Sequence, residues 1–138
     1  MRFMILRKAD SNTEQGVMPG TELLGAMGKY AEEMMKAGVM LGGEGLKPTS
    51  EGVRVKFDKG KPRVTDGPFA ETKELVAGYF LIQVPSKAEA IEWAKRWPPL
   101  DGEVELEIRA VFEEDDFGDE FTPEQREAEA RMRAQLAK

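Results

Sequence analysis

Residues 75–84 form a run, LVAGYFLIQV, that is apolar on both of its alternating faces. Such a strand is normally covered on both sides, whereas a surface strand alternates apolar with polar residues. Residues 3–6 repeat the pattern in shorter form, between charged neighbours. A sheet that holds both strands therefore needs apolar cover on each of its two faces.

Two amphipathic segments can supply part of that cover. Residues 21–37 carry an apolar stripe at helical spacing, and Gly38 is well placed to end the helix. Residues 86–97 open with a capping box at Ser86 and predict a second helix. The predicted core positions of the two helices are Leu23, Met27, Tyr30, Met34, Ala90, Ile91, Ala94 and Trp97, with Trp93 off the stripe.

The remaining segments complete the order of elements. We expect a loop over 9–20, a strand from 39, and a strand with one buried face over 53–57, where apolar and charged residues alternate. A turn at 58–61 leads to a short edge strand over 62–65, and residues 103–112 alternate again. This order predicts an α+β fold, a ferredoxin-like βαββαβ-type sheet with an inserted β-hairpin. Because two helices cover only one face, we expect a homodimer in which a second copy covers the other.

The loop after the hairpin, Asp66-Gly67-Pro68-Phe69 followed by a polar run over 71–74, is the best candidate for a site. Asp and Gly favour a tight turn and Pro68 stiffens it, so the Asp66 carboxylate is presented on a rigid loop. The same pattern also builds an ordinary turn, and both interpretations stay open. Asp66 is the catalytic candidate, and the predicted ligand-binding residues are Glu44, Gly45, Gly67, Pro68, Phe69, Glu71, Lys73, Glu74 and Tyr79.

Glycines surround one of these candidates. Glu44 lies in the segment Gly-Gly-Glu-Gly over 42–45. The glycines permit close backbone approach by a ligand, or a bulged end of the strand. The segment lacks the Lys-Ser/Thr ending of a phosphate-binding loop.

The composition limits which reactions the protein can catalyse and which partners it can bind. The chain has no cysteine and no histidine, which excludes thiol chemistry and the commonest general base near neutral pH. We predict no cofactor and no metal centre, although the acids at 44, 66, 71 and 74 are of the kind that holds Mg²⁺ or Ca²⁺. A net charge of −6 disfavours direct binding of nucleic acid. No apolar run suits a membrane span or a signal sequence, so we expect a cytoplasmic protein.

The C-terminal segment differs in composition from the rest. Residues 1–112 are expected to form one domain, and residues 113–120 an acidic linker. A helix should follow, with Thr122 as N-cap, Pro123 at its first position and Gln125 completing a capping box. Its apolar stripe is narrow, so it needs to dock on the core or on a partner.

Several of these segments, 37–46, 64–74 and 78–80, resemble the YCII-related family, in its DGPF-domain branch. The resemblance covers residues 1–112 and implies a ferredoxin-like subunit that forms a dimeric α/β barrel, with a cleft between the sheet and the partner. It also implies association with extracytoplasmic-function sigma factors. Some relatives in the wider family are similar to lyases or isomerases that use a His–Asp pair, which a chain without histidine cannot carry.

Three functions follow as hypotheses. The first is a homodimer that binds or transforms a small molecule at the Asp66 loop, and as an enzyme it would be an acid/base lyase or isomerase based on carboxylates. The second is a non-catalytic interaction module for a sigma factor, using the acidic segment and the terminal helix. The third is a structural dimer in which the loop only fastens the hairpin to the sheet.

Overall fold

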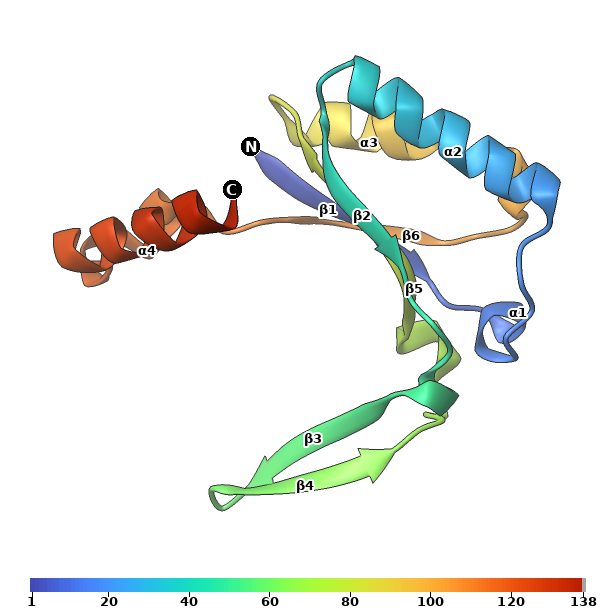
Figure 1. The fold of residues 1–138 in the computed structure, drawn as a ribbon, viewed down its shortest axis with the longest axis horizontal. Helices are drawn as coiled ribbons and strands as arrows, with labels where there is room; N and C mark the ends of the chain where they lie inside the picture. The colour runs from blue at the N-terminus through green and yellow to red at the C-terminus, as the bar shows by residue number, and fades with distance from the viewer. Residues whose placement is uncertain (138) are drawn as a thin grey trace.

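The computed structural model describes residues 1–137, built around a four-stranded sheet. Its strands are β1 (Arg2–Lys8), β2 (Met40–Gly45), β5 (Val76–Gln83) and β6 (Leu106–Ala110), in the order β2-β5-β1-β6. Every neighbouring pair is antiparallel, and the two buried-looking runs of the sequence, β1 and β5, lie side by side at the centre. This is the ferredoxin-like arrangement predicted from the element order (Figure 1).

Helices α2 (Thr21–Lys36) and α3 (Lys87–Lys95) lie together on one face of the sheet (Figure 1). The core between them includes Phe3, Ile5, Met34 and Ile82, each at most 1% exposed. Three aromatic rings pack edge to face within it, with centroids 5.6–5.8 Å apart: Tyr30, Phe80 and Trp97. Such contacts add to the free energy gained by burying the rings.

The two helices largely confirm the predicted stripes, with one correction. Tyr30, Ala90 and Trp97 are buried as expected, but Ile91 is 37% exposed. Trp93 instead packs against the core, and its carbonyl oxygen accepts a hydrogen bond of 2.6 Å from the Tyr30 hydroxyl. The small side chains at 90 and 94 let α3 approach the sheet closely, which turns the neighbouring position 93 inward and 91 outward. Burial raises the pKa of Tyr30 to about 12.

The segment predicted as a loop over 9–20 contains a short helix, α1 (Ser11–Glu14). Asp10 is its N-cap, accepting a hydrogen bond of 2.9 Å from the Thr13 amide, while Thr13 Oγ1 accepts one from the Asp10 amide. This reciprocal capping box stabilises a turn that has no apolar stripe to reveal it. Short 3₁₀ turns occur at η1 (Thr49–Glu51), η2 (Thr72–Glu74) and η3 (Pro99–Asp101).

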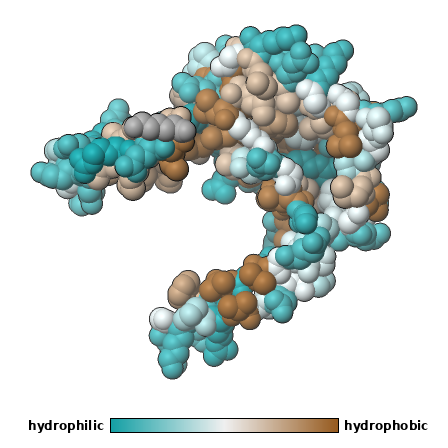
Figure 2. Space-filling view, viewed as in Figure 1, coloured by the Kyte–Doolittle hydropathy of each residue, from teal (hydrophilic) through white to brown (hydrophobic). Residues whose placement is uncertain are grey.

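The hairpin of β3 (Val53–Asp58) and β4 (Lys61–Asp66) forms a separate two-stranded sheet that projects from the body (Figure 1). The prediction of one buried face is wrong for this subunit. Val53, Val55, Phe57 and Val64 are each more than half exposed. Figure 2 shows apolar surface on this projecting element.

The C-terminal segment forms a second projection (Figure 1). It consists of a 3₁₀ segment, η4 (Glu114–Glu120), at the position of the predicted acidic linker, and helix α4 (Pro123–Leu136). The Thr122–Gln125 capping box of α4 is present as predicted. Arg2 Nε forms an ion pair with Glu113 Oε1 at 3.3 Å, and this contact fixes the start of the segment to β1. Of the helices in residues 1–137, none is long and apolar enough to cross a membrane.

Candidate functional site

The face of the sheet opposite α2 and α3, here called the open face, carries a centre of half-buried apolar side chains. Residues paired across neighbouring strands share a face. Met4 pairs with Leu81 and Leu6 with Tyr79, and these four positions alternate with the core residues Phe3, Ile5, Phe80 and Ile82. The other strand neighbours of Met4 and Leu6 are Arg109 and Glu107. The open face therefore has an apolar centre with ionisable groups beside it.

A β-bulge places Glu44 on this face. The register of β2 shifts between Met40, which pairs with Ile82 on the core side, and Gly42, which pairs with Leu81. One extra residue on a strand moves every later side chain to the other face. Glu44 consequently lies opposite Tyr79, so two predicted ligand-binding residues are neighbours. Of the two alternatives for the glycine-rich segment, the structure shows a bulge, but it lies where the segment begins, between Met40 and Gly42, and not at the end of the strand.

The glycines on either side of Glu44 have different surroundings. A β-carbon on Gly43 would lie 2.6 Å from the Phe80 ring, so packing on the core side requires this glycine. Gly42 and Gly45 have open space at the corresponding position. Gly45 pairs with Gly78 at the end of β2, next to Glu44.

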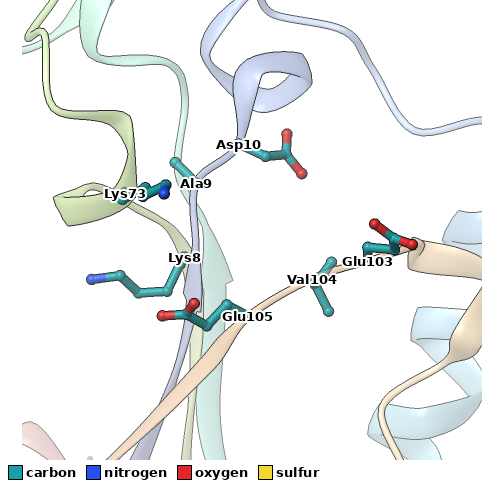
Figure 3. Close-up of a pocket in the computed structure, with 7 residues that line it drawn as sticks. All are labelled: Lys8, Ala9, Asp10, Lys73, Glu103, Val104 and Glu105. Carbon is teal, nitrogen blue, oxygen red and sulfur yellow. The ribbon is translucent and has the colours of Figure 1, made fainter.

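A cleft of about 220 Å³ lies at the end of β1, beside the open face (Figure 3). Its lining side chains are mainly charged: Lys8, Asp10, Lys73, Glu103 and Glu105, with Ala9 and Val104. Lys8 links the cleft to the open face, because its Nζ is also 3.8 Å from Glu107 Oε1. Of the predicted site residues, only Lys73 lines this cleft.

Beneath the cleft, on the helix side of the sheet, lies a buried ionic cluster that the sequence analysis missed. Arg7 is 8% exposed and donates two hydrogen bonds to Asp101, at 3.1 and 3.0 Å, and one to Asp10 at 3.2 Å. Trp97 Nε1 also donates to Asp101, at 2.9 Å. Burial disfavours the charged guanidinium, but Asp101 and Asp10 outweigh it and leave the pKa of Arg7 above its usual value. The sequence carries one sign of this cluster. Arg7 follows Phe3 and Ile5 at alternating positions, which places a charged side chain on the inward face of the strand.

The Asp66 loop, defined here as residues 66–74, is fastened by its glycine and its backbone. The Gly67 amide donates to the Gly52 carbonyl at 2.9 Å, and a β-carbon on Gly67 would overlap the Thr49 carbonyl. The Phe69 amide donates to Thr49 Oγ1 at 3.1 Å. Thr49 is itself held by Glu14, which accepts bonds from its amide at 3.0 Å and its hydroxyl at 2.6 Å.

The other members of the loop have distinct environments. The peptide bond between Gly67 and Pro68 is cis, and Pro68 is exposed. The Phe69 ring is half-buried beneath Arg54, whose guanidinium carbon is 3.8 Å from the ring centroid. This contact is a cation–π interaction, and it connects the loop to β3. Glu71, Lys73 and Glu74 are exposed.

The Asp66 carboxylate is exposed at the end of β4 and accepts no hydrogen bond from any group in residues 1–137. It lies opposite Val53, so it shares a face of the hairpin with the exposed valines. The four predicted acids do not converge. Throughout the described chain, no group of three or more acidic side chains is placed to hold a metal ion.

Comparison with known proteins identifies the family. The model of the YCII-related domain matches residues 1–115. The chain belongs to the YCII-related family. The match leaves most of the C-terminal projection outside the domain shared by YCII-related proteins.

Two individual proteins are similar to this YCII-related chain. An uncharacterised protein of Rhizobium meliloti (strain 1021) is 36% identical over 70 residues, which are 49% of this chain and 56% of that protein. The matched segment thus spans little more than half of the relative. Among solved structures, 5-chloro-2-hydroxyhydroquinone dehydrochlorinase from Burkholderia phenoliruptrix AC1100, in complex with 2,5-dihydroxybenzoquinone, is 13% identical with a TM-score of 0.47. That similarity covers 81% of this chain and 94% of the dehydrochlorinase.

Proposed function

We propose that this YCII-related protein is a homodimer that binds a small polar molecule between the open face of its sheet and a second copy, with Asp66 as an acid/base group of the site. The unpartnered carboxylate of Asp66, on a loop whose other groups are fixed, carries the proposal. A carboxylate that fastened the loop would accept bonds from nearby amides, but Thr49 and Gly67 do that work instead.

The open face supports the dimer. Met4, Leu6 and Leu81 form an apolar centre, and no helix of residues 1–137 covers it. Removing apolar surface from water stabilises association by roughly 25 cal/mol per Å². Closing a second sheet over this centre would enclose the polar groups of Glu44, Tyr79 and Lys8. Binding sites of small molecules typically combine apolar walls with a few polar groups in this way.

The chemistry open to such a site is proton transfer. In the proposed reaction, the Asp66 carboxylate removes a proton from a carbon next to a carbonyl group and returns it at another atom of the same molecule. Such an isomerisation is balanced without any further reactant. Tyr79 and Lys73 would donate hydrogen bonds to the carbonyl or carboxylate oxygens of the bound molecule.

A thermal-shift screen against carbonyl- and carboxylate-containing metabolites and divalent ions tests the proposal. A ligand at 100 times its dissociation constant stabilises the folded state by about 2.7 kcal/mol, which is easily seen in the melting temperature. We expect a hit with the wild type that is lost in Asp66→Asn, and Asp66→Asn without ligand should melt like the wild type. Asp58→Asn is the matched control at the other end of the hairpin, and it should keep the hit.

The contradictory result is a ligand that Asp66→Asn binds as well as the wild type does. A strongly destabilised Asp66→Asn would also contradict the proposal, because it would assign Asp66 to the fastening of the loop. For a confirmed ligand, incorporation of deuterium from solvent, followed by NMR, tests the proton transfer directly. Loss of incorporation in Asp66→Asn at saturating ligand is the expected result.

An interaction module for a sigma factor is the second candidate, favoured by the acidic C-terminal projection with its exposed aromatic side chains. Phe112 and Phe117 are 69% and 49% exposed, and residues 113–120 carry six acidic residues and no basic one. Binding of a purified extracytoplasmic-function sigma factor, lost on deletion of residues 113–138, is the result that this function predicts. Equal binding by the deleted protein would exclude the projection as the contact.

A further inference from the structure

Two projections leave the body of the molecule and end far apart from each other (Figure 1). One is the β3–β4 hairpin, and the other is the C-terminal arm, defined here as residues 112–137. Both extend away from α2 and α3, and the sheet lies between their points of attachment (Figure 1). Both projections carry apolar side chains that are exposed within the described residues 1–137.

The hairpin has one apolar face and a basic character. Val55 pairs with Val64 and Phe57 with Pro62, so these side chains share a face with Val53. The exposed fractions of the three valines and Phe57 lie between 52% for Val55 and 70% for Phe57. Residues 53–66 contain five basic and two acidic residues, a net charge of +3. An exposed apolar patch of this kind marks an interaction surface.

The C-terminal arm has a complementary groove. A hollow of about 490 Å³ lies between η4 and α4, lined by the apolar residues Phe117, Phe121, Ala128 and Met132, the acidic residues Glu120 and Glu129, and Gln125. Residues 112–137 contain nine acidic and three basic residues, a net charge of −6.

The arm is held together as one unit. Arg126 Nη1 is 3.4 Å from both Glu114 and Asp115, and Arg126 Nε donates to the Phe121 carbonyl at 3.1 Å. The guanidinium also lies over the Phe121 ring, 5.1 Å from its centroid. These contacts connect η4 to α4, so the groove is formed before any partner arrives.

In a two-fold symmetric dimer, a contact between projections of the two copies can be of two kinds: each projection meets its own counterpart, or the hairpin of one copy meets the C-terminal arm of the other. Pairing like with like would set +3 against +3 and −6 against −6, whereas exchange sets +3 against −6 twice. Opposite charges across an interface favour the correct pairing, and like charges disfavour the alternative. We propose that the apolar face of each β3–β4 hairpin docks in the groove of the C-terminal arm of the second copy.

This inference rests on the proposed homodimer and adds a specific contact to it. The arm lies almost wholly beyond residue 115, where the match to the YCII-related domain ends. The exchange would thus be an addition to the shared domain, in which each copy clasps the hairpin of its partner. It would also hold the base of the hairpin, where Asp66 lies opposite Val53, in a fixed position.

Cross-linking tests the contact, because the chain has no cysteine and single thiols can be introduced without interference. Val55→Cys places a thiol on the hairpin, and Met132→Cys places one in the groove. Both wild-type side chains are more than half exposed, so the variants should fold. The two variants are refolded together from urea and treated with a short bis-maleimide, and Leu24→Cys, exposed on α2, serves as the control thiol.

The mixture of Val55→Cys and Met132→Cys should give a covalent dimer, while each variant alone and each mixture with Leu24→Cys should give little. Cross-linking of Val55→Cys to itself at equal yield would overturn the inference, because it would place hairpin against hairpin. Light scattering of the same samples separates the two proposals. A dimer without the mixed cross-link overturns the arm exchange alone, whereas a monomer overturns the homodimer on which it rests.

Discussion

The backbone carbonyl oxygen of Thr49 occupies the position that a β-carbon on Gly67 would need. The two residues lie in different elements, η1 and the loop after β4, and their contact fixes where the hairpin leaves the body. Thr49 adds a second constraint, because its hydroxyl accepts a hydrogen bond from the Phe69 amide and donates one to the Glu14 carboxylate. The Asp66 loop is thus positioned by backbone packing around one threonine.

Gly67→Ala should destabilise the protein by about 3 kcal/mol, because the added methyl group must displace the Thr49 backbone. Thermal or urea unfolding measures the change. Hydrogen exchange at the Gly52 and Gly67 amides should rise more than exchange in α2.

Gly28→Ala is the matched control. This glycine is exposed within α2, and a β-carbon there has no neighbour within 4 Å. Alanine in a helix interior is favoured over glycine by about 1 kcal/mol, so this variant should be more stable than the wild type. Equal stability of the Gly67→Ala variant and the wild type would show that the loop adapts easily.

Arg7→Met should cost about 3 kcal/mol, because it leaves Asp101 largely buried without its charged partner. Arg63→Met removes a similar pair with Asp58 in which the Arg63 side chain is 73% exposed, and should cost about 0–1 kcal/mol. Urea unfolding of the two variants gives the comparison. Similar losses in both would contradict a structural role for the buried cluster.

The cap of α1 should make stability fall in acid. The Thr13 amide and the Arg7 guanidinium hold the pKa of Asp10 below its usual value of 3.8. A carboxyl with a lowered pKa in the folded state contributes stability at higher pH, and this contribution is lost as the pH falls from its usual pKa through the folded one. The Asp10→Asn variant keeps a side-chain oxygen that can cap the helix, but this side chain does not ionise. The difference in unfolding free energy between wild type and variant should therefore shrink below about pH 4, and a constant difference would contradict the assignment.

The sequence predicted the parts of the fold that depend on neighbouring residues. The stripe that holds Tyr30 and Met34 and the capping box at Thr122 follow from local spacing. The order of these elements along the chain then predicts a ferredoxin-like sheet, which the strand order confirms. The contact of Arg7 with Asp101 does not follow from local spacing, because 94 positions separate the two residues. The exposure of Ile91 depends in the same way on how α3 lies against the sheet.

The candidate site was predicted less completely. Glu44 and Tyr79 are neighbours, but only because a bulge resets the register of β2, and the glycine-rich segment permitted a bulge without fixing its position. Lys8 lies at the junction of the cleft and the open face, where the sequence marked only a charged strand end. The distance of Asp66 from the other acids reflects the projection of the hairpin, which alternation alone does not reveal.

Leu81→Glu should convert the proposed dimer to a monomer, because it places a charge at the apolar centre of the open face. Leu81 points away from the core, so the circular dichroism spectrum should be unchanged. Leu24→Glu is the control, at a residue of α2 that is 58% exposed, and it should leave the mass measured in solution equal to that of the wild type. A dimeric Leu81→Glu would place the interface elsewhere.

The mass of the wild-type protein in solution tests the central claim most directly. Light scattering at micromolar concentration should give twice the chain mass of 15.4 kDa, because in the proposed homodimer a second copy covers the open face of the sheet. A mass of 15.4 kDa across the micromolar range would mean that this face stays open. It would contradict the enclosed site on which the proposed function depends.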